Sequence, residues 1–231
     1  MKKTLITLSI MLIAVSSYGQ SMKNRKFDIQ KIDSTTYFTA KENANIPEET
    51  NLEKITDFEQ AKKMLKGRVT WGKYDEKIGK YVENEQGEAV YKILFRNGKT
   101  YLYDDSYGIF FIAYYPQEDI LLLEGGHCSD VIFNLTTGAK TDDVGNPENI
   151  RYSPSKKYRF NSYYSGQAGV YFIQKKTKTQ YKTIIHLSEE LRKTTDFIEY
   201  FIEYFSDAFW QSDTVLFFIV EDSLYYQLIL K

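Results

Sequence analysis

From Val69 onward the chain consists mainly of short segments rich in Tyr, Phe, Ile and Val, separated by turn residues. These residue types favour the half-buried surface of a β-sheet. Breaks such as Pro116, Gly125-Gly126 and Pro154 end the segments at strand length. Many short strands at this spacing are typical of all-β folds. The sequence therefore predicts a mainly β fold: an antiparallel meander, a sandwich or a partial barrel-like sheet, with one or two covering helices.

Turn signals set the expected strands. Asn97-Gly98 is the strongest hairpin signal in the chain, because both residues tolerate the positive φ angles of a tight two-residue turn. We expect strands over residues 89–96, 99–103, 107–115, 119–124, 130–135, 158–164, 169–175, 180–187, 214–221 and 224–230.

A weak internal repeat accompanies these strands. Two stretches share a turn, an outgoing strand, a loop and a return strand; Pro116 and Pro154 are 38 residues apart, and Val131 and Val170 are 39 apart. A third copy would begin at Trp210. A unit of about 40 residues is loosely similar to a β-propeller blade. Hairpins rich in Tyr produce such matches in any meander, and we favour that interpretation.

Helical patterns occur in two places. Thr56 is the predicted N-cap of a first helix, with Glu59 completing a capping box and Gly67 ending the helix. The second segment is 195–207, in which Phe, Ile and Glu recur every four residues. A Thr at its start favours a helix, and a strand is the alternative. In either form the segment would cover a face of the sheet.

The N-terminus is typical of a bacterial secretory signal peptide. Met1-Lys2-Lys3 is basic, residues 5–15 are apolar, and small residues at Ser17 and Gly19 precede a cut before Gln20. The apolar run is shorter than the roughly 20 residues that span a bilayer. We therefore expect residues 1–19 to be removed, no transmembrane span in the mature chain, and a periplasmic or secreted protein.

The rest of the chain divides into a lead-in and one domain. Residues 20–52 are polar and weakly periodic, and we expect an extended lead-in with one edge strand around Tyr37-Phe38-Thr39. A single mainly β domain would span residues 53–231.

Composition excludes several classes of function. One Cys excludes an intrachain disulfide, and two His residues leave little for a zinc centre. A net charge of −1 argues against a nucleic-acid partner. No phosphate loop or dinucleotide motif is present, so we expect no metal and no cofactor. Cys128 is expected to be a small buried hydrophobe; an intermolecular disulfide or a reactive thiol stays open.

Residues 125–130 (GGHCSD) bring several reactive residue types together. His127 and Asp130 are weak candidates for catalysis. Adjacent residues on an extended strand point to opposite faces, so His127 and Cys128 are not expected to pair. We favour a structural loop here. The carboxylate pairs lie near strand and helix ends, where solvated acids are common, and the basic run at 175–178 is expected to be a solvated hairpin tip.

Tyrosine is the remaining clue, since 20 are present. Consecutive tyrosines place one ring on each face of a strand, so we expect exposed rings that form a binding surface. Its predicted residues are Tyr114, Arg159, Tyr163, Tyr164 and Gln167. We therefore expect an exported, non-catalytic recognition module that binds a protein or a glycan. The alternatives are a carboxylate- or His-based hydrolase and a structural subunit of an envelope assembly.

Overall fold

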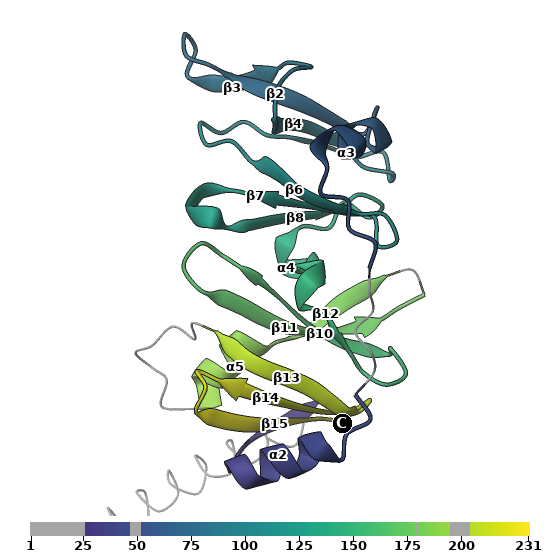
Figure 1. Ribbon diagram of the computed structural model, residues 1–231, viewed down its shortest axis with the longest axis vertical. Coiled ribbons are helices and arrows are strands. Elements are labelled where there is room, and N and C mark those ends of the chain that lie inside the picture. Colours follow the sequence, from purple (N-terminus) through teal and green to yellow (C-terminus); the bar gives the residue numbers. More distant parts are fainter. Residues whose placement is uncertain (1–25, 47–51, 179, 195–203) are drawn as a thin grey trace, which may run out of the picture.

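The computed structural model describes residues 26–46, 52–178, 180–194 and 204–231. They form three antiparallel β-sheets, which lie in a row along the long axis of the molecule (Figure 1). We name them the barrel sheet, the middle sheet and the end sheet. The predicted fold class, mainly β with antiparallel sheets and a partial barrel, is confirmed.

The barrel sheet has seven strands in the order β3-β2-β4-β6-β7-β8, with β5 paired to β4. It curls into a half-barrel around a core that includes Trp71, Ile93 and Leu121. Helix α3 (Phe58–Met64) packs Phe58 edge-on against Trp71, with ring centroids 4.7 Å apart. The strands are β2 (Val69–Asp75), β3 (Lys80–Glu83), β4 (Ala89–Leu94), β5 (Thr100–Leu102), β6 (Phe110–Tyr115), β7 (Ile120–Glu124) and β8 (Asp130–Asn134).

The local signals of this region are mostly confirmed. Asn97-Gly98 connects β4 to β5, and Gly98 has a φ of +83°, which a residue with a Cβ rarely adopts. Helix α3 begins one residue later than predicted. The side chain of Asp57, rather than that of Thr56, accepts a hydrogen bond from the first turn and caps the helix.

The middle sheet has four strands in the order β12-β11-β10-β9. Helix α4 (Thr141–Val144) lies between this sheet and the barrel sheet (Figure 1). Helix α5 (Leu187–Thr194) follows β12 and buries Leu191 against the sheet. Two short 3-10 turns, η1 (Gly126–Cys128) and η2 (Pro147–Asn149), complete the connections. The strands are β9 (Arg151–Tyr152), β10 (Tyr158–Tyr164), β11 (Gly169–Lys176) and β12 (Tyr181–His186).

The end sheet joins both ends of the described chain, in the order β1-β15-β14-β13. Strand β1 (Phe27–Ile32) pairs antiparallel with β15 (Leu224–Leu230), next to β14 (Val215–Val220) and β13 (Phe205–Ser212). Helix α2 (Ser34–Glu42) covers the outer face of the sheet (Figure 1). The N-terminal segment therefore completes the sheet of the C-terminal one.

The strand predicted around Tyr37-Phe38-Thr39 is wrong, because these residues lie in helix α2. The Asp33 side chain accepts a hydrogen bond from the first turn and starts the helix there. Tyr37 is fully buried against the rings of Phe209 and Phe217, and its hydroxyl donates to Asp207 over 2.7 Å. Residues 26–46, the part of the lead-in that the structure describes before helix α3, thus form a strand and a helix rather than an extended segment.

The helix predicted at 195–207 lies mostly outside the described residues, which omit 195–203. From Phe205 onward the chain is strand β13, so the last part of that helix prediction is wrong. The ring of Phe205 stacks on Tyr171, 4.0 Å away, and on Phe218, 5.0 Å away, and this packing favours the strand.

The weak repeat has a structural counterpart. Its copies correspond to a turn followed by a strand in successive sheets: β7 in the barrel sheet, β10 in the middle sheet and β14 in the end sheet. The sheets follow one another in a row in Figure 1.

Residues 1–19, the predicted signal peptide, lie outside the described part of the chain. Within the described ranges, no helix combines the length and hydropathy that crossing a bilayer requires.

Candidate functional site

The two faces of the middle sheet differ. Tyr158 and Phe160 of β10 point to the end sheet and join one large apolar core. Arg159 and Asn161, which alternate with them, point to the barrel sheet. Aromatic packing dominates the first interface. The second combines the polar side chains of β10 with an apolar cluster that includes Tyr115, Ile120 and Val144.

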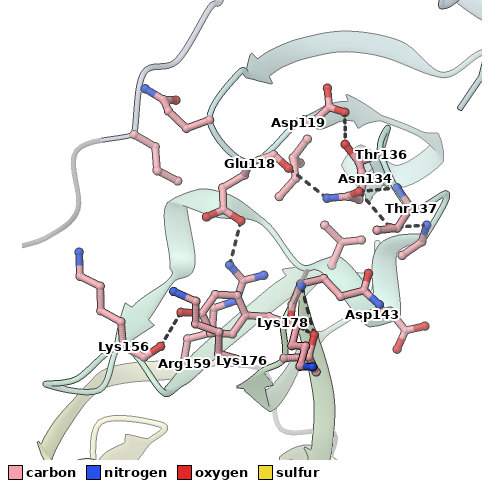
Figure 2. A pocket seen from close by; sticks show the side chains of 18 of the residues that line it. Glu118, Asp119, Asn134, Thr136, Thr137, Asp143, Lys156, Arg159, Lys176 and Lys178 are labelled. Carbon is pink, nitrogen blue, oxygen red and sulfur yellow. Dashed lines mark hydrogen bonds and ion pairs between the residues drawn. The ribbon is translucent and has the colours of Figure 1, made fainter. Parts of the chain in front are cut away.

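The second interface opens into a cleft of ≈ 430 Å³ (Figure 2), a size within the range of about 300–1,000 Å³ typical of ligand sites. Its walls are the β6–β7 turn, the segment after β8, the β9–β10 turn and the β11–β12 hairpin. The lining residues are Leu52, Gln117, Glu118, Asp119, Ile120, Asn134, Thr136, Thr137, Ala139, Asp143, Val144, Tyr152, Lys156, Arg159, Lys176, Thr177, Lys178, Gln180 and Tyr181.

Arg159 lies at the base of the cleft and is only 3% exposed. Its Nε donates to Oε1 of Gln174 over 2.6 Å, and its Nη1 lies 3.4 Å from Oε2 of Glu118 across the cleft (Figure 2). The guanidinium carbon stands 4.1 Å from the ring centroid of Tyr181. Two acceptors and an aromatic ring thus fix this buried cation.

Gln174 and Glu118 extend the network to both sheets. The Gln174 side-chain amide donates to the Asp143 carbonyl over 2.6 Å and thereby ties β11 to helix α4. Glu118 also accepts from the Tyr152 hydroxyl over 3.4 Å. Every member of the network has a partner before any ligand arrives, so the base of the cleft is preorganised.

Tyr152 and Tyr181 are half-buried neighbours, with ring centroids 5.9 Å apart. Burial, followed by the nearby Tyr152, raises the pKa of Tyr181 to about 12. Burial, followed by the Glu118 charge, also raises the pKa of Tyr152. Both phenols therefore keep their proton at neutral pH and serve as hydrogen-bond donors.

Asp119 stabilises the wall of the cleft. Arg96 donates to its carboxylate twice, over 2.6 and 3.0 Å, and the hydroxyls of Thr136 and Tyr114 donate over 2.6 and 2.9 Å. Burial alone would raise the pKa of Asp119, but these hydrogen bonds and the Arg96 charge outweigh it, and the pKa is lowered. The carboxylate stays ionised and holds the β6–β7 turn.

Three lysines form the rim of the cleft: Lys156 in the β9–β10 turn, Lys176 at the end of β11, and Lys178 in the β11–β12 hairpin. In the described part of the chain, none of them has an acidic side chain within ion-pair distance. We call these residues the lysine rim. The Lys156 Nζ lies 5.6 Å from the centroid of the Tyr152 ring, and no carboxylate neutralises any of the three charges in the described part of the chain.

The predicted binding residues are only partly brought together. Arg159 lies in the cleft, although it is buried rather than part of an exposed surface. Tyr163 and Tyr164 lie at the other end of β10, and Gln167 in the turn that follows. Tyr114 is buried, because both faces of β6 are covered, and so it does not reach the surface on which we expected it.

The structure instead joins Tyr164, a predicted binding residue, to Asp130, which the sequence analysis named as a weak candidate for catalysis. Asp130 accepts hydrogen bonds from the Tyr164 backbone N–H over 2.9 Å and from the Asn146 side chain over 3.2 Å. The Tyr163 hydroxyl donates to Asp142. Gln167 lines a smaller cavity of ≈ 180 Å³ together with His186. Asp130 thus anchors the end of β10 to the barrel sheet.

His127 and Cys128 lie in turn η1 and not on an extended strand, so the geometry that we assumed for them is wrong. Both have a φ of 56°, in the left-handed region. The turn packs closely against Gly166, where an added Cβ would lie 3.2 Å from Cβ of His127. Cys128 is exposed, so the expectation of a buried thiol is also wrong.

Sequence reasoning missed most of the cleft: Glu118, Tyr152, Gln174, Tyr181 and the lysine rim. The alternation of apolar and polar side chains along β10 was visible in the sequence. The sequence did not indicate which face of the strand would line a cleft. Lys176 and Lys178 belong to the basic run that we expected to be a solvated hairpin tip.

The chain matches no family model, and neither a curated protein nor a solved structure is significantly similar to it. Among the described residues, no group of three or more His, Cys, Asp and Glu side chains is placed to hold a metal ion. The functional argument therefore depends on the cleft itself.

Proposed function

We propose that this chain is an exported, non-catalytic recognition module that binds a protein or a glycan in the cleft between the barrel sheet and the middle sheet. The observation that carries the proposal is Arg159, a buried cation held by Glu118, Gln174 and the Tyr181 ring at the base of a cleft of ligand size. A buried charge with fixed geometry is costly to build and is typical of a site that orients a ligand.

The carboxylates of the cleft favour binding over hydrolysis. A general acid works best with a pKa raised toward the operating pH. Asp119 has a lowered pKa and accepts from three side chains, and Glu118 is engaged by Arg159 and Tyr152. Both arrangements support a structural and positioning role.

The experiment compares ligand binding by the wild-type protein and by Arg159→Gln, with glycan and protein arrays as the source of ligands. We expect Arg159→Gln to lose the ligands that the wild type binds. The matched control is Arg68→Gln, which changes a partly exposed arginine of the barrel sheet beyond the cleft lining. Thermal melting verifies that each variant is folded. Tyr181→Leu provides a second test in the same cleft if Arg159→Gln melts early. Retention of all ligands by both cleft variants would contradict the proposal.

Export is the other part of the proposal, supported by the N-terminal sequence. Fractionation of cells followed by N-terminal sequencing should place the protein outside the cytoplasm, with Gln20 as its first residue. A protein that keeps residues 1–19 in the cytoplasm would contradict it.

A further inference from the structure

We infer that the ligand of the cleft is an acidic glycan, in which uronate or sulfate groups contact the lysine rim while the sugar rings lie against Tyr152 and Tyr181. This inference rests on the proposed function and specifies its ligand.

The charge balance of the cleft is the first argument. Four cationic and three acidic side chains line it. One of the acids, Asp119, is paired with Arg96, which lies outside the lining, so that Arg96 adds a fifth positive charge. The Glu53 carboxylate, which accepts a hydrogen bond from Gln117 of the lining, offsets that charge. The lining and these two partners therefore carry one net positive charge, in a chain whose net charge is −1. Clefts with a charge of one sign concentrate ligands of the opposite sign.

Two acids of the cleft are paired with arginines, whereas none of the rim lysines has a carboxylate partner in the described part of the chain. The third acid of the lining, Asp143, has no ion-pair partner there, and the Lys156 Nζ lies 5.6 Å from the centroid of the Tyr152 ring. Glu118 interacts with Arg159 and Asp119 with Arg96. Arg159 itself has five N–H donors, and the bonds to Gln174 and Glu118 use two of them. The other N–H groups of Arg159, at the base, and the ammonium groups of the lysine rim thus remain as donors. An anionic ligand would accept charge-assisted hydrogen bonds from them.

The uncharged lining argues for a sugar as the carrier of the negative charge. Amide and hydroxyl side chains line the walls of the cleft, and such groups both donate to and accept from sugar hydroxyls. Four of them are Asn134, Thr136, Thr177 and Gln180. The Thr136 hydroxyl already donates to Asp119 and the Thr177 hydroxyl to the Gln180 carbonyl, so these two are left to accept from a sugar hydroxyl. The half-buried rings of Tyr152 and Tyr181 provide flat apolar area beside these polar groups.

An acidic peptide fits this lining less well. Acidic peptide motifs are typically bound by clusters of arginines, and other peptides by a free sheet edge or by apolar pockets for side chains. The lining contains one arginine, Arg159, and its other cations are lysines. Leu52, Ile120, Ala139 and Val144 are the aliphatic residues of the lining, and Ile120 and Val144 are buried in the core between the two sheets. The cleft therefore offers a peptide few apolar anchors.

The experiment is titration calorimetry of the full protein with four probes: polygalacturonate, dextran sulfate, neutral dextran and poly-glutamate. The rim variant replaces Lys156, Lys176 and Lys178 by Gln. The matched control removes the same charge from three exposed lysines of the barrel region, Lys63, Lys66 and Lys77.

We expect at least one acidic polysaccharide to bind. The rim variant should weaken it by about tenfold or more, and the control by less than about twofold. Binding by polygalacturonate alone assigns uronate, and binding by dextran sulfate alone assigns sulfate.

Three results would overturn the inference. Poly-glutamate could bind as tightly as the polysaccharides, which would indicate an acidic peptide. The control could weaken binding as much as the rim variant, which would indicate non-specific attraction. Neutral dextran could bind independently of the lysine rim. In that last case, loss of binding in Arg159→Gln would preserve the proposed function, whereas unchanged binding in Arg159→Gln would refute both.

Discussion

Strand β10 sends alternate side chains to two interfaces of opposite character. Tyr158 and Phe160 pack on the end sheet, where the Tyr158 ring stacks with Trp210, with centroids 6.3 Å apart. Arg159 faces the barrel sheet and the cleft, and Asn161 donates to the Val144 carbonyl of helix α4 over 2.9 Å. One sheet thus has an apolar face and a polar face, each covered by another sheet.

The difference suggests separate roles for the two interfaces: we expect the apolar one to stabilise the fold and propose the polar one for binding. On the apolar side, stacked aromatic rings fill most of the interface and leave a pocket of ≈ 190 Å³ beside Phe160 and Phe205, and burial supplies the free energy of folding. On the polar side, hydrogen bonds and the ion pair between Arg159 and Glu118 connect the two sheets at the cleft. Such pairs add little net stability, because their desolvation offsets most of the gain. We therefore expect substitutions on the two faces to separate stability from binding.

The largest effect on stability should come from Trp210→Ala, on the apolar side. Trp210 is 1% exposed, and its indole N–H donates to the Arg151 carbonyl over 2.9 Å. Removing a buried Trp costs about 3–5 kcal/mol. Urea unfolding should show this loss. The exposed Tyr164→Ala serves as the control. Equal midpoints for the two variants would contradict the role of this interface.

An intermediate effect is expected for Arg159→Met on the polar side. It leaves the Glu118 carboxylate and the Gln174 carbonyl oxygen without their partner, which costs about 1–3 kcal/mol. The double variant Arg159→Met with Glu118→Gln should recover part of the loss, because no unpaired charge remains. A double-mutant cycle by urea unfolding measures this coupling. Purely additive losses would show that Glu118 and Arg159 do not interact.

Asp119→Asn should have a smaller effect that depends on pH. The pKa of Asp119 in the folded protein lies below its ordinary value of 3.8. Its stabilising contribution is therefore complete above about pH 4 and is lost as the pH falls through the folded pKa. We expect Asp119→Asn to lower stability by roughly 1–2 kcal/mol at pH 6.

The gap between wild type and Asp119→Asn should stay constant down to about pH 4 and narrow as the pH falls further, through the folded pKa, as measured by urea unfolding at each pH. Asp104→Asn, an exposed carboxylate paired with Lys80, is the control. A gap between wild type and Asp119→Asn that also stays constant below about pH 4 would contradict the ionised role of Asp119.

The smallest effect on stability should come from the lysine rim. Substitutions of surface residues usually change stability by less than about 0.5 kcal/mol. Each of the variants Lys156→Gln, Lys176→Gln and Lys178→Gln should melt close to the wild type. A large loss in any of them would show that the rim stabilises the fold rather than a ligand.

Local signals in the sequence predicted ten of the strands, the Asn97-Gly98 turn and helix α3, because turn chemistry and strand periodicity act over a few residues. Strands β1, β2, β3, β9 and β13 were not among the predicted ranges. The local signals failed at Tyr37, whose helix is stabilised by packing on strands about 170 residues later, near Phe209. They also failed at Phe205, where stacking on Tyr171 and Phe218 favours a strand.

The cleft was harder to predict, for a related reason. Glu118, Arg159 and Tyr181 come from three segments, and no local pattern indicates that they meet. The polar residues of β10 were visible as an alternation with Tyr158 and Phe160. Whether such a face meets water or another sheet depends on topology, which periodicity does not encode.

The most direct test of the account is the change in backbone amide NMR shifts when an acidic oligosaccharide, such as tri-galacturonate or a sulfated counterpart, is added to the protein. Our account predicts changes confined to the walls of the cleft, near residues 116–119, 134–137, 152–159 and 174–181. Amides of the end sheet should not move. Changes centred on the Tyr164–Gln167 end of β10 or on turn η1, or no changes at all, would contradict it.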